Sequence, residues 1–174
     1  MPETPYDAER SRFTREGLAR LVLSDDAMGL AAAASALVST RQDPYCGPGG
    51  RASEAVHLIE LAERLLASAV IYERERGSSW QEIAQYLGID PAEAEARFTP
   101  DLAAWATAFA VPYRPDKTGR KRVPQLPPAA YDPAWACKNL DRRSSIHHLG
   151  TDDPHAVSAT LPMTPPDPPE EPSP

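Results

Sequence analysis

The chain has 174 residues, a formal net charge of −7 at neutral pH and 20 prolines, 14 of which lie after residue 111. This length allows one modest domain with tails. The two cysteines, Cys46 and Cys137, lie far apart and belong to no motif, which predicts reduced cytosolic thiols. The sequence contains no Gly-rich phosphate loop, nucleophile elbow or paired-carboxylate signature, so we expect neither an enzyme nor a bound cofactor.

The first 52 residues predict a pair of helices followed by a loop. Residues 7–23 have an amphipathic pattern, and Ser24 is placed to cap a second helix that begins with Asp25 and Asp26. The second helix carries small apolar residues, including the alanine run 31–34, which suit close packing within the chain or across a homodimer. That apolar run is too short to predict a membrane span, and nothing resembles a signal peptide, so we predict a cytoplasmic protein.

Residues 53–76 form the longest periodic segment, with apolar positions about every 3.6 residues over a broad face, which is typical of a buried helix. Beyond it, Ser79 and Glu82 have the spacing of a capping box. Gly88 can end that next helix in a left-handed conformation, and Asp90 can cap a further one. Because two short helices joined by a glycine turn are too small to be stable alone, we expect a three-helix unit.

The sequence motif in residues 77–98 resembles that of a known family. The matching segments are Gly77-Ser78-Ser79-Trp80, Ile83-Ala84, Leu87-Gly88-Ile89, Ala94 and Arg97-Phe98. They are similar to helix-turn-helix DNA-binding proteins of the actinobacterial type. The resemblance implies a DNA-binding or transcription-associated protein, in which the start of the second helix and Arg97 would enter the major groove.

Acidic and basic side chains are distributed unevenly along the chain. Residues 53–111 contain four basic and ten acidic side chains, a net charge of −6, whereas residues 112–150 contain eight basic and three acidic ones, a net charge of +5. A DNA-binding domain normally presents a basic face, because phosphate neutralisation supplies much of the affinity. On the outward face of the second helix, Arg97 is the one cation, beside Glu93 and Glu95. The alternative is therefore a protein-protein interaction module that keeps the fold without reading DNA.

The basic run RPDKTGRKR, residues 114–122, has no apolar periodicity and predicts a linker. It would lie in a minor groove of DNA as a basic arm, stay a solvated linker, or fold back on the acidic helices. If the protein binds double-stranded DNA, the expected contacts are those of Arg97, Arg114, Lys117, Arg120, Lys121 and Arg122.

The rest of the chain predicts two more helices and a tail. Thr99 is placed to cap a helix that carries Trp105 and Phe109, and Asp132 to cap a last helix that ends near residue 149. Residues 151–174 are acidic and rich in proline, which predicts disorder. The C-terminal histidines match no zinc spacing, so no metal site is expected.

Together these patterns predict an all-α protein with a three-helix helix-turn-helix core. The expected segments are an N-terminal helical pair and loop (1–52), a helix-turn-helix domain (53–111), a basic linker with a short helix (112–150) and a disordered tail (151–174). The expected partner is double-stranded DNA, with a homodimer or a protein partner as the alternatives, and no membrane.

Overall fold

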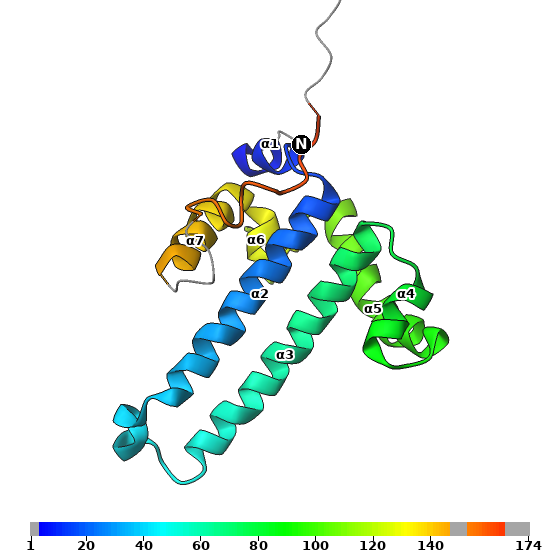
Figure 1. Cartoon of the computed structure of the whole chain (residues 1–174). Helices are drawn as coiled ribbons and strands as arrows, with labels where there is room; N and C mark the ends of the chain where they lie inside the picture. Colours follow the sequence, from blue (N-terminus) through cyan, green and yellow to red (C-terminus); the bar gives the residue numbers. More distant parts are fainter. Residues whose placement is uncertain (1–3, 147–152, 166–174) are drawn as a thin grey trace, which may run out of the picture.

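Two long antiparallel helices form the axis of the molecule (Figure 1). They are α2 (Arg15–Val38) and α3 (Gly50–Glu75), joined by a short 3-10 helix, η1 (Thr40–Tyr45). The computed structural model describes residues 4–146 and 153–165, which contain seven α-helices and one two-stranded sheet. The predicted all-α character is confirmed.

Helix α2 is one continuous element, so the predicted break at Ser24 is wrong. A separate short helix, α1 (Pro5–Ser11), comes before it, and the Thr14 hydroxyl caps α2 by accepting a hydrogen bond from the amide of Gly17 at 3.0 Å. The Ser24 hydroxyl instead accepts from Arg20 at 2.6 Å. The helix continues because Leu21 and Met28, on either side of Ser24, are both buried in the same core.

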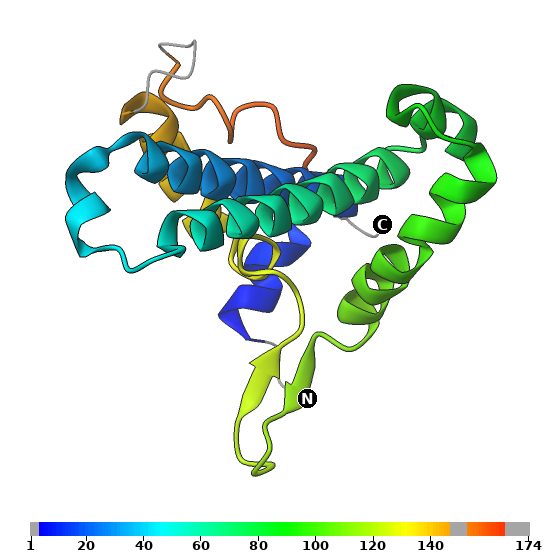
Figure 2. The same ribbon diagram turned by 90° about the horizontal axis from the view of Figure 1, so that it is seen from below.

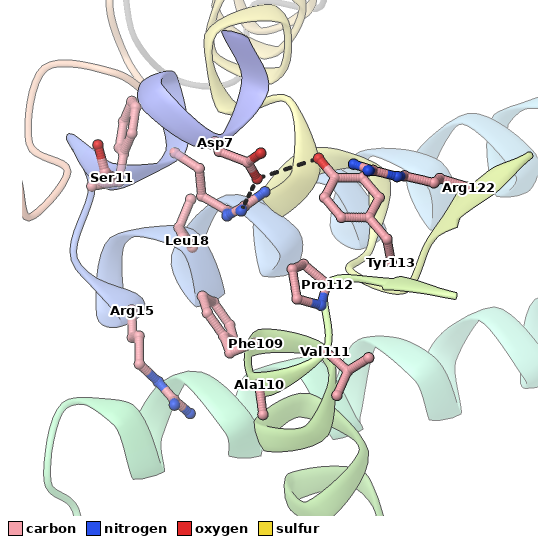
Figure 3. Close-up of a pocket in the computed structure, with 12 residues that line it drawn as sticks. Asp7, Ser11, Arg15, Leu18, Phe109, Ala110, Val111, Pro112, Tyr113 and Arg122 are labelled. Atoms are coloured by element: carbon pink, nitrogen blue, oxygen red, sulfur yellow. Dashed lines mark hydrogen bonds and ion pairs between the residues drawn. The ribbon is translucent and has the colours of Figure 1, made fainter. Parts of the chain in front are cut away.

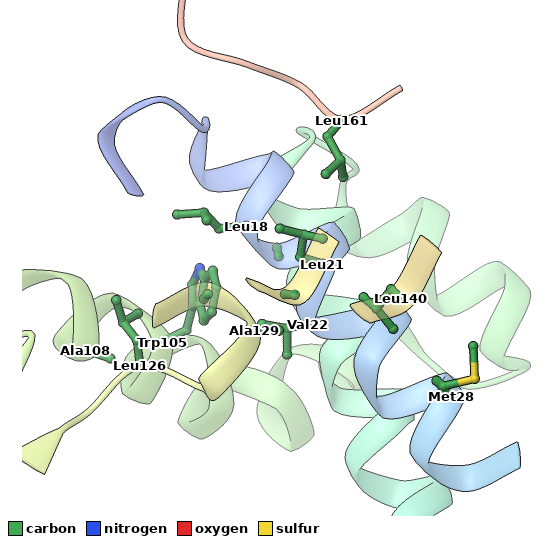
Figure 4. Close-up of a cluster of buried hydrophobic side chains, with 13 residues drawn as sticks. Leu18, Leu21, Val22, Met28, Trp105, Ala108, Leu126, Ala129, Leu140 and Leu161 are labelled. Carbon is green, nitrogen blue, oxygen red and sulfur yellow. The ribbon is translucent and has the colours of Figure 1, made fainter. Parts of the chain in front are cut away.

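The main core lies where the upper half of α2 meets α6 (Pro128–Tyr131), α7 (Pro133–Ile146) and α5 (Pro91–Ala110), as Figure 4 shows. Leu18, Trp105, Leu140 and Leu161 are all buried in it. Each of these comes from a different one of the four segments expected from the sequence. The indole of Trp105 also donates to the Glu75 carboxylate at 2.8 Å, which ties α5 to α3.

Helix α5 runs straight through Thr99 and Pro100, where a new helix was expected to begin. Proline inside a helix removes one backbone hydrogen bond. Here the Thr99 hydroxyl donates to the carbonyl of Glu95 at 2.7 Å. Phe98 on one side of the proline and Trp105 on the other are both buried, so packing holds the two halves in one helix.

The segment 153–165 packs on the helices, which corrects the prediction of disorder for this part of the tail. The Asp141 carboxylate accepts hydrogen bonds from the amides of Val157 and Ser158 at 2.9 and 3.1 Å. The Pro162 carbonyl accepts from the Thr14 amide at 3.2 Å, and Leu161 is buried. A few apolar side chains are enough here, because the Asp141 carboxylate on α7 and the Thr14 amide just before α2 already provide fixed hydrogen-bonding partners. Residues 151–152 and 166–174 lie outside the described residues.

By length and composition alone, α2 could cross a membrane. The core helices of many other proteins meet the same two criteria. In α2 the residues Asp25 and Asp26 lie near the middle, and Asp26 forms an ion pair with Arg64 and a 2.6 Å hydrogen bond with Ser68, both on α3. The middle of α2 is therefore engaged in polar contacts with its neighbour.

Candidate nucleic-acid interface

Four residues define the ends of α4 (Trp80–Leu87) and the turn that joins it to α5. The Ser79 hydroxyl accepts from the amide of Glu82, whose carboxylate accepts in return from the Ser79 amide at 2.7 Å. This exchange holds the pKa of Glu82 below its ordinary value. Gly88 ends α4 with a φ of 67°, a left-handed conformation that glycine adopts without strain, and Asp90 caps α5.

A small apolar cluster holds α4 and α5 against the C-terminal end of α3. Its buried members are Val70, Ile83 and Phe98, with Leu66, Trp80 and Leu87 packed around them. We call residues 79–98 the α4–α5 unit. The Arg74 guanidinium lies 4.8 Å from the centre of the half-buried Trp80 ring, so the edge of the cluster is covered by a cation–π contact.

The outward surface of the α4–α5 unit is acidic. Glu93 and Glu95 are exposed on the first turns of α5, and the alanines beside them offer no hydrogen-bonding group. Arg97, the one cation expected here, is exposed, and its guanidinium carbon lies 5.0 Å from the centre of the Phe98 ring. A single Arg among carboxylates is a weak surface for base reading, which normally uses Arg, Lys, Asn or Gln.

The segment predicted as a basic linker forms a β-hairpin. Strand β1 (Tyr113–Pro115) pairs antiparallel with β2 (Arg122–Pro124), with Arg114 opposite Val123. We call residues 113–124 the basic hairpin. The two strands flank a Gly-containing turn, a spacing that is a recognisable hairpin signal. The prolines of the segment made that hairpin signal hard to recognise in the sequence.

The tip of the basic hairpin is organised by Asp116. One of its carboxylate oxygens accepts hydrogen bonds from the hydroxyl of Thr118 at 2.8 Å and from the amides of Thr118 and Arg120 at 3.0 Å. The Thr118 hydroxyl is the main cause that lowers the pKa of Asp116. Gly119 has a φ of 71°, as this turn requires. The turn that contains Lys117, Arg120 and Lys121 therefore has a defined backbone shape.

The base of the hairpin is anchored to α1 (Figure 3). The phenol of Tyr113 donates to Asp7 at 3.3 Å, and its oxygen lies 3.1 Å from the Thr4 hydroxyl. Burial opposes ionisation of Asp7, but hydrogen bonds from Thr4 and the charge of Arg10 outweigh it and lower the pKa of Asp7 to about 2. The sequence carried no signal for this anchor, since Asp7 and Tyr113 are separated by most of the chain.

A groove of about 710 Å³ lies between this anchor and the end of α5. Phe109, Val111 and Pro112 form its apolar wall, and Arg10 and Arg122 contribute its basic groups. The guanidinium of Arg122 also lies 5.9 Å from the centre of the Tyr113 ring. Arg122 is thus held at the side of the hairpin, and the tip cations extend beyond it.

All five cations of the basic hairpin are exposed. Within residues 4–146 and 153–165, none of them forms an ion pair with a carboxylate. The structure therefore shows no folding back of this run on the acidic helices. The five are Arg114, Lys117, Arg120, Lys121 and Arg122.

Arg97 and the basic hairpin do not form one patch. Thirteen residues of α5 separate Arg97 from the end of the helix, a rise of about 20 Å. Figure 2 shows the hairpin projecting at one end of α5 and α4 at the other. The hairpin is therefore the one place, among the expected site residues, where several cations gather.

The remaining candidate groups carry no metal-binding geometry. In the part of the chain that the structure describes, no three His, Cys, Asp or Glu side chains come close enough to hold a metal ion. His147 and His148 lie outside that part, and His155 is exposed. Both cysteines are free thiols, and burial raises the pKa of Cys137 to about 11, which keeps it protonated at neutral pH.

No protein-family model matches the chain, and no curated protein or solved structure shows significant similarity to it.

Proposed function

We propose that this protein binds double-stranded DNA, with the basic hairpin as the main contact. The observation that carries the proposal is the set of five exposed cations on a projecting two-stranded ribbon, none of which pairs with a carboxylate in the part of the chain that the structure describes. Phosphate neutralisation by Lys and Arg supplies most of the affinity of non-specific DNA binding. A two-stranded ribbon is also narrow enough to enter a groove. A transcription-associated role would follow from such binding.

The α4–α5 unit supports the proposal in a second way. The proposal takes its two helices, which are joined by a glycine turn and packed on α3, as a helix-turn-helix. In this proposal the unit serves as a scaffold, because its outward surface is acidic. Arg97 supplies one local contact, and the hairpin at the far end of α5 supplies the others. Phosphate contacts from the hairpin would position the protein without selecting a sequence.

Fluorescence anisotropy with a labelled random-sequence duplex tests the proposal. If all five hairpin cations and Arg97 contact phosphates, the affinity should fall roughly 1,800-fold between 50 and 200 mM salt. In the double variant Arg120→Gln/Lys121→Gln, four contacts remain and the fall should be only about 150-fold. The matched control is Lys138→Gln/Arg142→Gln, which removes two exposed cations from α7 and should leave the salt dependence unchanged. No binding at 50 mM salt, or equal effects of the two double variants, would rule the hairpin out.

A second candidate function is protein binding by the α4–α5 unit. Tyr86 is 90% exposed and borders a groove of about 660 Å³ between α3 and α4, which also includes Leu66 and Val70. An exposed aromatic beside an apolar groove, with Glu82 at its rim, suits a partner segment that carries both apolar and basic residues. Affinity capture with wild type and with Tyr86→Glu, each followed by mass spectrometry, would test this function, since only wild type should retain the partner.

A further inference from the structure

The last described residues of the chain lie beside the groove between α1 and the end of α5. The amide of Thr164 donates to the Arg12 carbonyl at 2.9 Å, and the residue before Thr164 forms an antiparallel bridge with Phe13. Ser11 and Phe13, on either side of Arg12, both line the groove. Figure 3 shows Ser11 on the α1 side of it. The chain therefore continues beyond Pro165 from the edge of this groove.

The wall of the groove exposes apolar surface. Val111 is 50% exposed, and Phe109 and Pro112 are half-buried. Phe13 and Tyr113 add two more aromatic rings to the lining. Grooves lined by aromatic rings bind proline-rich segments well, because a polyproline II helix is already extended and loses little entropy on binding. The lining therefore suits a segment rich in proline.

The charged groups of the groove leave a surplus of positive charge. Asp7 pairs with Arg10, and Arg15 pairs with Glu75, whereas Arg122 forms no ion pair with a carboxylate among the described residues. Nη1 of Arg10 is also buried without a hydrogen-bond partner in the same part of the chain. A buried donor without an acceptor is costly. An occupant that carries carboxylates therefore complements this wall.

Residues 166–174, which lie outside the described residues, combine these two properties in their sequence. They read PDPPEEPSP, with five prolines, three acidic side chains and no basic one. We call them the PDPPEEPSP segment. A polyproline II helix has three residues per turn. In that conformation the prolines at positions 166, 169 and 172 share one edge, and Asp167 and Glu170 share the next. One edge matches the apolar wall, and the other matches the cations.

The PDPPEEPSP segment is long enough to cross the groove. Nine residues in a polyproline II helix span about 28 Å. Along the groove, Ser11 lies four residues from Asp7 on α1, a rise of about 6 Å. The Tyr113 phenol lies 3.3 Å from Asp7, and the Arg122 guanidinium carbon lies 5.9 Å from the centre of the Tyr113 ring. The segment therefore reaches Arg122 from its starting point beside Ser11.

We propose that the PDPPEEPSP segment docks in this groove, with its prolines against Phe109 and Val111 and its carboxylates towards Arg122. Docking covers one of the five cations of the basic hairpin and brings three carboxylates beside the other four. The segment then competes with phosphates for the hairpin, a consequence that rests on the proposed DNA binding. The docking itself does not rest on it.

A DNA backbone fits the same groove less well. Phosphates complement the charge of Arg122, but they bring no apolar surface to cover Phe109 and Val111. The PDPPEEPSP segment supplies both kinds of contact, and it is tethered at the edge of the groove. A tethered segment acts at a high effective concentration, so weak individual contacts are enough to hold it.

Paramagnetic NMR on the full chain tests the docking. A nitroxide is attached at Ser173→Cys, with Cys46 and Cys137 both replaced by Ala, and spectra of isotope-labelled protein are compared before and after the nitroxide is reduced. The oxidised nitroxide should broaden the amide signals of Val111 and Tyr113. Because a free segment would also approach nearby amides at times, matched variants decide the result.

Arg122→Gln should remove most of this broadening, because it removes the unpaired cation of the groove. The matched control Arg114→Gln removes an exposed cation of the same hairpin that does not line the groove, and it should leave the broadening unchanged. Absence of broadening overturns the proposal, and so do equal effects of the two variants. Broadening that passes from spin-labelled protein to added isotope-labelled protein without a nitroxide would place the segment on a second copy and overturn it too.

A second measurement needs no new cysteine, so it keeps the test valid if the cysteine replacements unfold the protein. Asp167→Asn/Glu170→Gln/Glu171→Gln changes only the PDPPEEPSP segment. Docking predicts that this triple variant shifts the amide signals on the groove wall relative to wild type, and that the same change has no effect in an Arg122→Gln background. Identical wall signals in wild type and the triple variant overturn the proposal.

The same triple variant separates docking from DNA binding. If the segment is docked in at least half of the molecules, the triple variant should bind a random duplex at least about twofold more tightly than wild type. This gain should vanish in the Arg122→Gln background. A gain that persists there reflects net charge alone and overturns the competition. If the broadening is present but neither protein binds DNA, the DNA proposal fails while the docking stands.

Discussion

The α4–α5 unit and the basic hairpin lie near opposite ends of the same helix, and they are built in opposite ways. The unit is held by buried apolar side chains, Val70, Ile83 and Phe98, and its outer surface is acidic. The hairpin has almost no buried side chains, is held by the polar contacts of Tyr113 and Asp116, and exposes five cations. The difference teaches that a compact helical scaffold and the main concentration of positive charge can reside in separate parts of one chain.

The largest effect should come from the apolar contact that holds the α4–α5 unit. Phe98 is 3% exposed, and Phe98→Ala should cost about 3–5 kcal/mol of the free energy of unfolding, because it leaves a cavity in a small cluster. Denaturant unfolding measures this loss. The control Tyr86→Ala, at a highly exposed position of α4, should stay within about 0.5 kcal/mol of wild type. A loss below about 1 kcal/mol for Phe98→Ala would show that the cluster does not hold the unit.

A smaller effect should come from the polar anchor of the hairpin. Asp7→Asn should cost about 1 kcal/mol at neutral pH, because it weakens charge-assisted contacts with Arg10 and Thr4. The pKa of Asp7 is lowered from 3.8 to about 2 in the folded protein. Its charged form therefore stabilises the fold above pH 3.8, and this contribution disappears as the pH falls towards 2.

Thermal melts between pH 2 and 7 measure this dependence. The difference between wild type and Asp7→Asn should be constant above pH 5 and should shrink below pH 4. The exposed Asp43, which also pairs with an Arg, gives a control in Asp43→Asn that should have a smaller effect. A difference that does not change with pH would mean that the Asp7 charge does not support the anchor.

The smallest expected effect is a change in DNA affinity, and it distinguishes the contributions of the two ends of α5. If the basic hairpin makes the main contacts, Arg97→Ala should weaken binding to a random duplex less than about fivefold, the effect of one lost phosphate contact. Arg120→Gln/Lys121→Gln should weaken it considerably more in the same titration at 50 mM salt. If Arg97→Ala has the larger effect, the start of α5 is the DNA contact and the hairpin is secondary.

Local patterns in the sequence account for the elements whose causes are local. The apolar face of α3 was expected to be buried, but Val56 and Ile59 on it are exposed. The caps at Ser79 and Asp90 and the glycine turn at Gly88 lie where the sequence predicts them. Such features depend on neighbours three or four residues away, so a single sequence carries them. The five cations were also found as candidates, because a run of charge needs no tertiary structure to be seen.

The tertiary structure decided where helices continue and what the basic run becomes. Ser24 and Thr99 have good capping chemistry, yet both lie inside helices because residues on either side of each are buried by tertiary packing. The hairpin depends on the contact of Tyr113 with Asp7, more than 100 residues away in the chain. Burial of Leu161 depends on α2 in the same way. Such contacts join residues that are distant in sequence, and their energy outweighs local preference only after the helices have packed.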